Sequence, residues 1–78
     1  MSVKREDLLE VAQEALDDLG IQNYRDLYLT LFKKAGNEWR VNFSYIPSWS
    51  WSNRVGCFAV NRQTDEITYS ALDRVWKA

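Results

Sequence analysis

The side chains of this sequence that could do chemistry are few and lie far apart. The chain of 78 residues contains no histidine and one cysteine, Cys57. Without histidine it lacks the commonest general base and the usual nitrogen ligand of zinc. Cys57 lies in an apolar run beside Gly56, with no activating base identifiable, so we interpret it as a buried structural thiol. The sequence predicts no catalytic residue, no metal site and no cofactor, and we expect that the protein is not an enzyme.

Two other patterns that can accompany catalysis point elsewhere. Asp65 and Glu66 are neighbours, and neighbouring residues of a strand face opposite ways, so we expect them at the rim of a hairpin. The three glycines, Gly20, Gly36 and Gly56, are scattered along the chain and form no phosphate-binding loop. The candidate functional residues are therefore those of binding surfaces.

The segment IPSWSWSN, residues 46–53, is the first candidate surface. It places Trp49 and Trp51 two residues apart among small polar residues, and Arg54 follows it directly. In one interpretation, which the sequence favours, both rings turn inward and complete a small core. In a second they anchor a partner protein, because tryptophan is enriched in interface hot spots. In a third, nucleic-acid bases stack on the rings beside Arg54.

An acidic helix face is the second candidate surface. Glu10, Glu14 and Asp17 recur at steps of four and three residues, which aligns like charges along one side of a helix. One interpretation is a solvated face that aids solubility. The other is a docking face for a basic partner, which predicts that association weakens as salt is added.

Composition limits the class of protein. Apolar residues make up 46% of the chain and aromatic residues 14%, which predicts one folded domain over residues 1–78. The formal net charge of -1 argues against binding of nucleic acid through phosphate neutralisation. No run approaches the roughly 20 apolar residues of a membrane span. A single cysteine is typical of a reducing compartment, so we expect a cytoplasmic protein that does not bind membranes.

Periodicity predicts the elements that position these residues. Apolar residues at three- and four-residue steps indicate a helix over residues 3–19, which Ser2 would cap and Gly20 would end. Two strands flank a turn at residues 35–38, a third strand covers 54–61 and a fourth covers 66–72. Ser70 to Asp73 matches a helix capping box, so we expect one or two helical turns after it.

These elements predict an α+β domain in which an N-terminal helix packs on a three- or four-stranded antiparallel sheet, with a short C-terminal helix. Alternation in the second strand gives one face to Trp39, Val41, Phe43 and Tyr45. The other face, expected to be open to solvent or to a partner, takes Arg40, Asn42 and Ser44. In the first strand, strict alternation separates Leu27, Leu29 and Leu31 from Tyr28 and Phe32.

The segments EWRVNF and VGCFAVNRQTDEITY resemble the pattern of PepSY domains, in which a late strand leads through a turn into one that starts Glu-Ile. They are also similar to small NTF2-like, or cystatin-like, immunity proteins. The resemblance covers residues 3–71. It departs from the PepSY pattern at Asn61, where the family has aspartate, and at Asp65, where it has glycine. It implies a non-catalytic domain that binds or inhibits another protein, and it carries no catalytic residue.

We therefore expect a small protein-binding module, an inhibitor or immunity-type factor that acts by covering a surface. Its expected contact residues are Trp49, Trp51 and Arg54, with Glu10, Glu14 and Asp17 as an independent face. One alternative is a single-strand nucleic-acid binder that uses the open sheet face through Tyr28, Phe32, Arg40 and Arg54. Another is a self-associating subunit, for example a homodimer, which pairs through an uncovered sheet face or edge.

Overall fold

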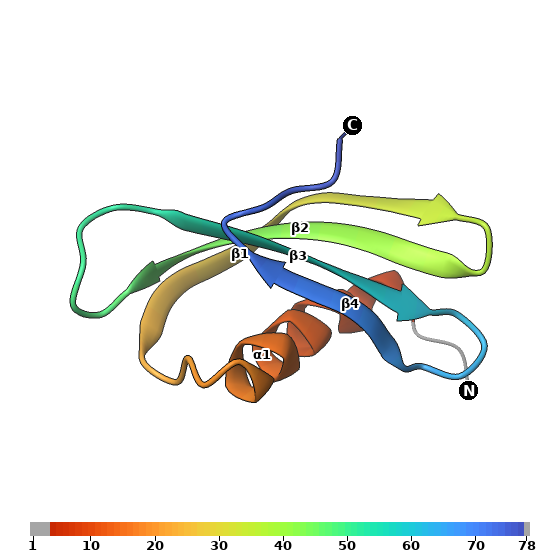
Figure 1. Ribbon diagram of the computed structural model, residues 1–78, viewed down its shortest axis with the longest axis horizontal. Coiled ribbons are helices and arrows are strands. Elements are labelled where there is room, and N and C mark those ends of the chain that lie inside the picture. Colours follow the sequence, from red (N-terminus) through yellow and green to blue (C-terminus); the bar gives the residue numbers. More distant parts are fainter. Residues whose placement is uncertain (1–3, 78) are drawn as a thin grey trace.

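The computed structural model describes residues 4–77, apart from the side chain of Arg5, and has one helix against a four-stranded antiparallel sheet. The short 3-10 turn η1 (Arg5–Asp7) leads into α1 (Leu8–Asp18). The strands are β1 (Tyr24–Ala35), β2 (Glu38–Pro47), β3 (Arg54–Asn61) and β4 (Ile67–Leu72), and they pair in chain order. Figure 1 shows α1 lying across one face of the sheet. This is the predicted α+β arrangement.

Helix α1 buries the apolar stripe that predicts it. Five of its residues are buried against the sheet, namely Leu8, Val11, Ala12, Ala15 and Leu16. The regular helix begins at Leu8, five residues later than predicted, because residues 5–7 form a 3-10 turn instead. The predicted cap, Ser2, lies outside the described residues. At the other end the prediction is confirmed, since Gly20 has φ 83° and Ile21 N–H donates to Leu16 O at 2.9 Å, as in a Schellman motif.

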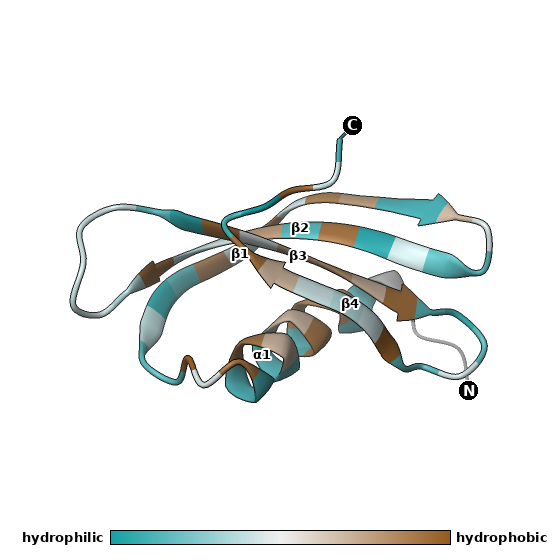
Figure 2. Ribbon diagram, in the orientation of Figure 1, coloured by the Kyte–Doolittle hydropathy of each residue, from teal (hydrophilic) through white to brown (hydrophobic). Residues whose placement is uncertain are grey.

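Strand β2 is the centre of the core, as its alternation predicts. Figure 2 shows hydrophobic and hydrophilic residues alternating along it. Its helix-facing residues are all buried, namely Trp39, Val41, Phe43 and Tyr45. From β3, Phe58 and Val60 join the same cluster and are completely buried. Gly56 lies opposite Phe43 in the ladder, where a Cβ atom would run into the Phe43 ring, so the close packing of this ring depends on the glycine.

Strict alternation fails in β1, and the predicted division of its residues is wrong. The pairing with β2 shifts between Leu29 and Leu31, because Thr30 is an extra residue in the ladder. Leu29 pairs with Phe43 on the helix side, whereas Leu31 pairs with Asn42 on the opposite side. Beyond the bulge, Phe32 returns to the helix side and packs against the core. A one-residue bulge thus moves a leucine out of the core and a phenylalanine into it.

The predicted C-terminal helix is wrong. Residues 70–72 of the supposed capping box belong to β4, where Leu72 pairs with Gly56 of β3. Asp73 has φ 62°, a left-handed conformation that cannot begin a right-handed helix. Residues 74–77 have neither helix nor strand structure. In Figure 1 this segment crosses the sheet on the side opposite α1, which we call the outer face.

Candidate functional site

The tryptophan loop, residues 48–53, connects β2 to β3 and is held by hydrogen bonds that the backbone N–H groups of its serines donate. Ser50 N–H donates to Pro47 O at 3.0 Å and closes a turn. Ser52 N–H donates to Ser50 Oγ at 3.1 Å, which orders the second half of the loop. Ser48 N–H donates to Asn23 O at 3.2 Å and fixes the start of the loop against the segment before β1. The serines therefore shape the loop, and the tryptophans are left free to project.

Both tryptophan rings of this loop face solvent. Trp49 is 74% exposed and Trp51 is 93% exposed, so the inward orientation that the sequence favours is wrong. The reason lies in the core beneath the loop, which closes without them. Tyr45 is only 3% exposed, and its ring packs edge-on against Tyr24 with centroids 6.1 Å apart. Tryptophans this exposed are unusual, which makes the loop a candidate contact surface.

Each exposed ring is paired with a different arginine. The guanidinium of Arg54 lies 5.4 Å from the ring centroid of Trp49, and that of Arg25 lies 5.6 Å from the centroid of Trp51. Arg25 also donates from Nη2 to Ser50 O at 3.2 Å. Such cation–π pairs are worth about 0.5–1 kcal/mol at exposed sites. They orient the two rings without covering them.

Sequence reasoning identified Arg54 and missed Arg25. β1 begins at Tyr24, and Arg25 pairs with Ile46 at the end of β2. That position places its side chain beside the loop that follows β2. The sequence signal that could have found Arg25 was the length of the first hairpin. Pairing the two strands outward from the turn at Gly36 places Arg25 opposite the end of β2, next to the tryptophan loop.

A small pocket lies between the tryptophan loop and the core. Its volume is about 130 Å³, and it is lined by Ile21, Tyr45, Pro47, Trp49, Arg54 and Leu72. Burial, followed by the nearby Asp73 carboxylate, raises the pKa of the Tyr45 phenol, although Arg54 opposes the shift. Arg54 also pairs with Asp73 at 3.4 Å, with both side chains well exposed. The pocket can accept an apolar group beside an arginine.

The acidic residues of α1 do share one surface. Glu10, Glu14 and Asp17 line a broad groove of about 530 Å³ that runs between α1 and the start of β1, with Ile21 and Tyr24 among its other walls. The groove and the small pocket have Ile21 in common. The two candidate surfaces that the sequence presents as independent are therefore neighbours, joined at the turn between α1 and β1.

The outer-face platform expected for nucleic-acid binding is not assembled. Phe32 packs on the helix side of the sheet. Arg40 is on the outer face, but the Trp76 ring lies against its guanidinium, 4.7 Å from the ring centroid. Tyr28 is 49% exposed and pairs with Ser44, whereas Arg54 lies by the tryptophan loop. These four side chains do not form one stacking surface.

Cys57 and the acidic pair of the last hairpin, Asp65 and Glu66, lie where a structural role accounts for them. Cys57 is 2% exposed, and burial raises the pKa of its thiol, which makes the nucleophilic thiolate scarcer. Asp65 has φ 62°, and its N–H donates to Asn61 O at 2.9 Å within the turn before β4. Among residues 4–77, no group of three or more histidine, cysteine, aspartate or glutamate side chains could hold a metal ion.

No match to this chain is found among protein-family models, curated proteins or solved structures. The resemblance to PepSY domains and to cystatin-like immunity proteins therefore stays a prediction. Within the part of the chain that the structure describes, no helix is long and apolar enough to cross a membrane.

Proposed function

We propose that this protein is a small, non-enzymatic protein-binding module whose main contact surface is the tryptophan loop. The observation that carries the proposal is the exposure of Trp49 and Trp51, at 74% and 93%, on a loop that is already ordered. Tryptophan has only two side-chain torsions, so fixing it in an interface costs little entropy. Arg25 and Arg54 hold the rings in place before a partner arrives. A preorganised loop loses less freedom on binding.

The pocket beside Trp49 supplies the depth that an interface hot spot requires. Hot spots cluster where an anchor side chain enters a desolvated pocket. Here the pocket lies against Tyr45 and Leu72, so an apolar side chain of the partner would meet the edge of the core. The partner that fits best is a folded protein or peptide that inserts one apolar residue between Trp49 and Ile21. Inhibition by covering a surface, as in an inhibitor or immunity-type factor, agrees with a module of this kind.

The acidic groove is proposed as a second contact region for a basic part of the same partner. Glu10, Glu14 and Asp17 lie beyond Ile21, so one partner can reach both regions. This part of the proposal predicts that affinity falls with salt. An affinity that does not change between low and high ionic strength would remove the groove from the interface and leave the loop. We also propose a cytoplasmic setting, where a free thiol such as Cys57 persists.

The test compares a loop variant with a matched surface variant in affinity capture followed by crosslinking. The loop variant is Trp49→Ala with Trp51→Ala. The control is Leu9→Ala with Tyr28→Ala, two exposed apolar residues away from the loop. The captured partner should crosslink near the loop of the wild type, and the loop variant alone should lose it by at least about thirtyfold, the equivalent of one hot-spot residue of about 2 kcal/mol. Equal capture by both variants would refute the proposal.

A second candidate function, binding of single-stranded nucleic acid, is favoured by one observation. Each exposed tryptophan has an arginine beside it, and aromatic rings with neighbouring cations are what single-strand binders use to stack bases and contact phosphates. The nearby acidic groove and the net charge of -1 oppose it. Titration of tryptophan fluorescence with poly-U and poly-dT at low salt decides the question, since quenching is expected only if bases stack on the loop.

A further inference from the structure

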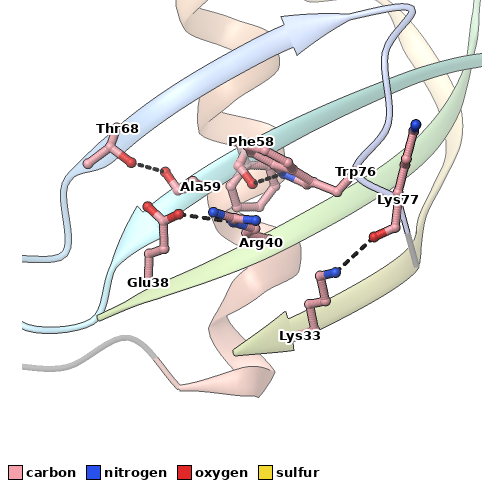
Figure 3. A network of polar contacts seen from close by, with 8 residues as sticks. All are labelled: Lys33, Glu38, Arg40, Phe58, Ala59, Thr68, Trp76 and Lys77. Carbon is pink, nitrogen blue, oxygen red and sulfur yellow. Dashed lines mark hydrogen bonds and ion pairs between the residues drawn. The ribbon is translucent and has the colours of Figure 1, made fainter. Parts of the chain in front are cut away.

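The last described segment of the chain, Asp73–Lys77, lies across the outer face of the sheet and is fastened there by one residue. Trp76 N–H donates to Asn42 Oδ1 at 2.6 Å, and Asn42 Nδ2 donates back to Trp76 O at 2.9 Å. The indole Nε1 donates to Phe58 O at 3.0 Å. Figure 3 shows this indole lying over the strands beside Arg40. Every polar group of Trp76 therefore has a partner on the sheet.

Asn42 is built into the sheet as a receptor for the backbone of an extended segment. It is 5% exposed, although it lies on the face that lacks a helix. Its side-chain amide offers one donor and one acceptor to a single residue, which is the exchange that two hydrogen-bonded residues make in an antiparallel ladder. A buried asparagine without such a partner would be destabilising. The outer face thus recognises a peptide unit, independent of the chain that supplies it.

The indole of Trp76 fills a site formed by side chains of β2 and β4 and by a backbone carbonyl of β3. Tyr69 of β4 lies with its ring centroid 5.2 Å from that of Trp76, and Arg40 of β2 covers the ring at 4.7 Å. The acceptor of the indole N–H is a carbonyl of β3. Lys33 of β1 extends the contact by donating from Nζ to Lys77 O at 2.8 Å. The site therefore selects an extended segment that carries a tryptophan.

The connection between β4 and this segment is a strained hinge. Asp73 has φ 62°, a left-handed conformation that costs energy in any residue with a Cβ atom, although aspartate adopts it more often than most. It is held by its N–H bond to Val55 O at 2.7 Å and by the exposed pair with Arg54. If the segment left the face, Asp73 could relax to an extended conformation. Release of the segment therefore relieves backbone strain at the hinge, which lowers the cost of exchanging it.

The segment is also long enough to reach a facing molecule. Four extended residues span about 13 Å, so residues 74–77 can leave their own face at Asp73 and reach the outer face of a neighbouring molecule. A neighbour seated there would cover Tyr69, whose ring lies against Trp76, and Val75, which precedes Trp76; these residues are 38% and 52% exposed. This exposed apolar surface beside the Trp76 site suits a second copy.

We propose that the outer face is a binding site for an extended, tryptophan-bearing segment, and that a second copy of this chain can fill it by exchanging residues 74–77. In the monomer the segment fills the site of its own molecule, as the structure shows. In the exchanged dimer each Trp76 makes the same bonds to the Asn42 of the other molecule. This proposal does not rest on the function proposed for the tryptophan loop, although the hinge residue Asp73 pairs with Arg54 beside that loop.

The first test presents the segment in trans. A fluorescein-labelled peptide of residues 73–77 is titrated into the full-length variant Trp76→Ala, whose own anchor is missing. Saturable anisotropy is expected, and a peptide with alanine in place of the tryptophan should not bind. The wild type should need at least about tenfold more protein, because its own segment competes at a high effective concentration. No binding to a folded Trp76→Ala variant overturns the proposal.

The second test changes the hinge and keeps the anchor, so its main variants do not require a folded Trp76→Ala protein. Asp73→Pro removes the N–H that Val55 accepts and forbids a positive φ. Light scattering should show a dimer of this variant that grows with concentration up to about 1 mM, the order of the competing effective concentration. Asp73→Gly, which accepts φ 62° without strain, should stay more monomeric than the wild type.

The double variant Asp73→Pro with Trp76→Ala is the specificity control and should be monomeric. Persistence of its dimer would show that another surface associates, which overturns the exchange. A monomeric Asp73→Pro at every concentration overturns it as well. Cys57 reports release of the segment independently, because it lies between Asn42 and Ala71 in the ladder on the outer face and is 2% exposed. Its reaction with a thiol reagent should be faster in Asp73→Pro than in Asp73→Gly.

Discussion

Trp76, on the outer face, and Trp51, in the tryptophan loop, each have an arginine guanidinium beside the ring, at 4.7 and 5.6 Å from the centroid. The two residues differ in their hydrogen bonds and in their exposure to solvent. Trp76 is half-buried and bonded through its amide, its carbonyl and its indole nitrogen. Trp51 is 93% exposed. The same cation–π contact therefore accompanies a structural residue in one region and a residue available for binding in the other.

The difference teaches that, between these two tryptophans, hydrogen bonds to buried groups and not the cation–π contact distinguish the one that belongs to the fold. When Trp76 leaves the face, Asn42 gives up two hydrogen bonds within the protein, each worth about 0.5–1.5 kcal/mol net. Arg25 can lose Trp51 and be solvated by water. The variants below would break or sharpen this comparison.

The largest loss of stability is expected on the face of the sheet that packs against α1. This loss is the reference against which the outer face and the tryptophan loop are compared. In Gly56→Ala the new methyl group would contact the Phe43 ring and lie 3.0 Å from Ala71 O, so the ring must move. We expect a loss of about 3 kcal/mol in the free energy of unfolding, the upper range for overpacking. Urea denaturation monitored by far-UV circular dichroism measures it. A loss below about 1 kcal/mol would mean that Phe43 has room to shift.

Trp76→Ala is expected to cost about 2 kcal/mol, less than the 3–5 kcal/mol of a fully buried tryptophan because the ring is half-buried. Trp76→Phe keeps a ring but loses the bond to Phe58 O, so it should cost less. Chemical denaturation of both variants ranks the ring against the indole bond. If Trp51→Ala cost as much as Trp76→Ala, the distinction between the two regions would be wrong.

Asn42→Ala isolates the backbone clamp from the ring it positions. The loss should be about 1.5 kcal/mol, because Trp76 loses both partners of its amide and carbonyl but can be solvated once it leaves the face. Faster labelling of Cys57 by a thiol reagent should accompany it. Unchanged labelling at lower stability would place the destabilisation elsewhere in the sheet.

Trp49→Ala with Trp51→Ala should change the free energy of unfolding by less than about 0.5 kcal/mol, as for other surface substitutions. The rings are solvated in the folded state, so removing them exposes little new surface. Thermal unfolding should therefore occur close to the wild-type temperature, whereas partner capture is lost. A fall comparable to that of Trp76→Ala would make the loop part of the core.

The smallest effect is expected from pH between 6 and 8. Burial raises the pKa of the Cys57 thiol above its ordinary 9.0 and that of the Tyr45 phenol above 10.0. Both groups are uncharged in the folded protein, and the unfolded chain loses their protons first as pH rises. Stability should be flat below about pH 8 and fall above about pH 9. Cys57→Ala should remove the part of this fall in stability that begins at lower pH. Tyr45→Phe should remove the part that comes from the phenol beside the loop.

The parts of the fold that depend on neighbouring residues could be predicted from the sequence. The end of α1 at Gly20 and the burial of alternate residues in β2 follow from spacing within a few positions. The Thr30 bulge could not, because no local signal separates an extra residue from an ordinary one. The residues from Ser70 to Asp73 do match a capping box, but contacts with distant residues decide the structure there. Trp76, for example, bonds to Asn42, which is 34 positions away.

The candidate site was predicted in part. Glu10, Glu14 and Asp17 share a groove, as helical spacing requires. The direction of Trp49 and Trp51 depends on whether the core beneath is already closed by Tyr45, and that is a property of the whole fold. Arg25 joins the loop only through the register of the hairpin.

The three aspartates with left-handed backbones also bear on aggregation. Asp26 has φ 54° and interrupts β1, one of the two edge strands, where the pairing with β2 shifts. Asp65 and Asp73, both with φ 62°, lie just before and just after β4, the other edge strand. The irregular pairing at Asp26 and the shortness of β4 limit the regular edge that a foreign strand could join, and each of these aspartates adds a negative charge there. The molecule can thus expose apolar residues on its outer face while its sheet edges resist the strand pairing that builds a fibre.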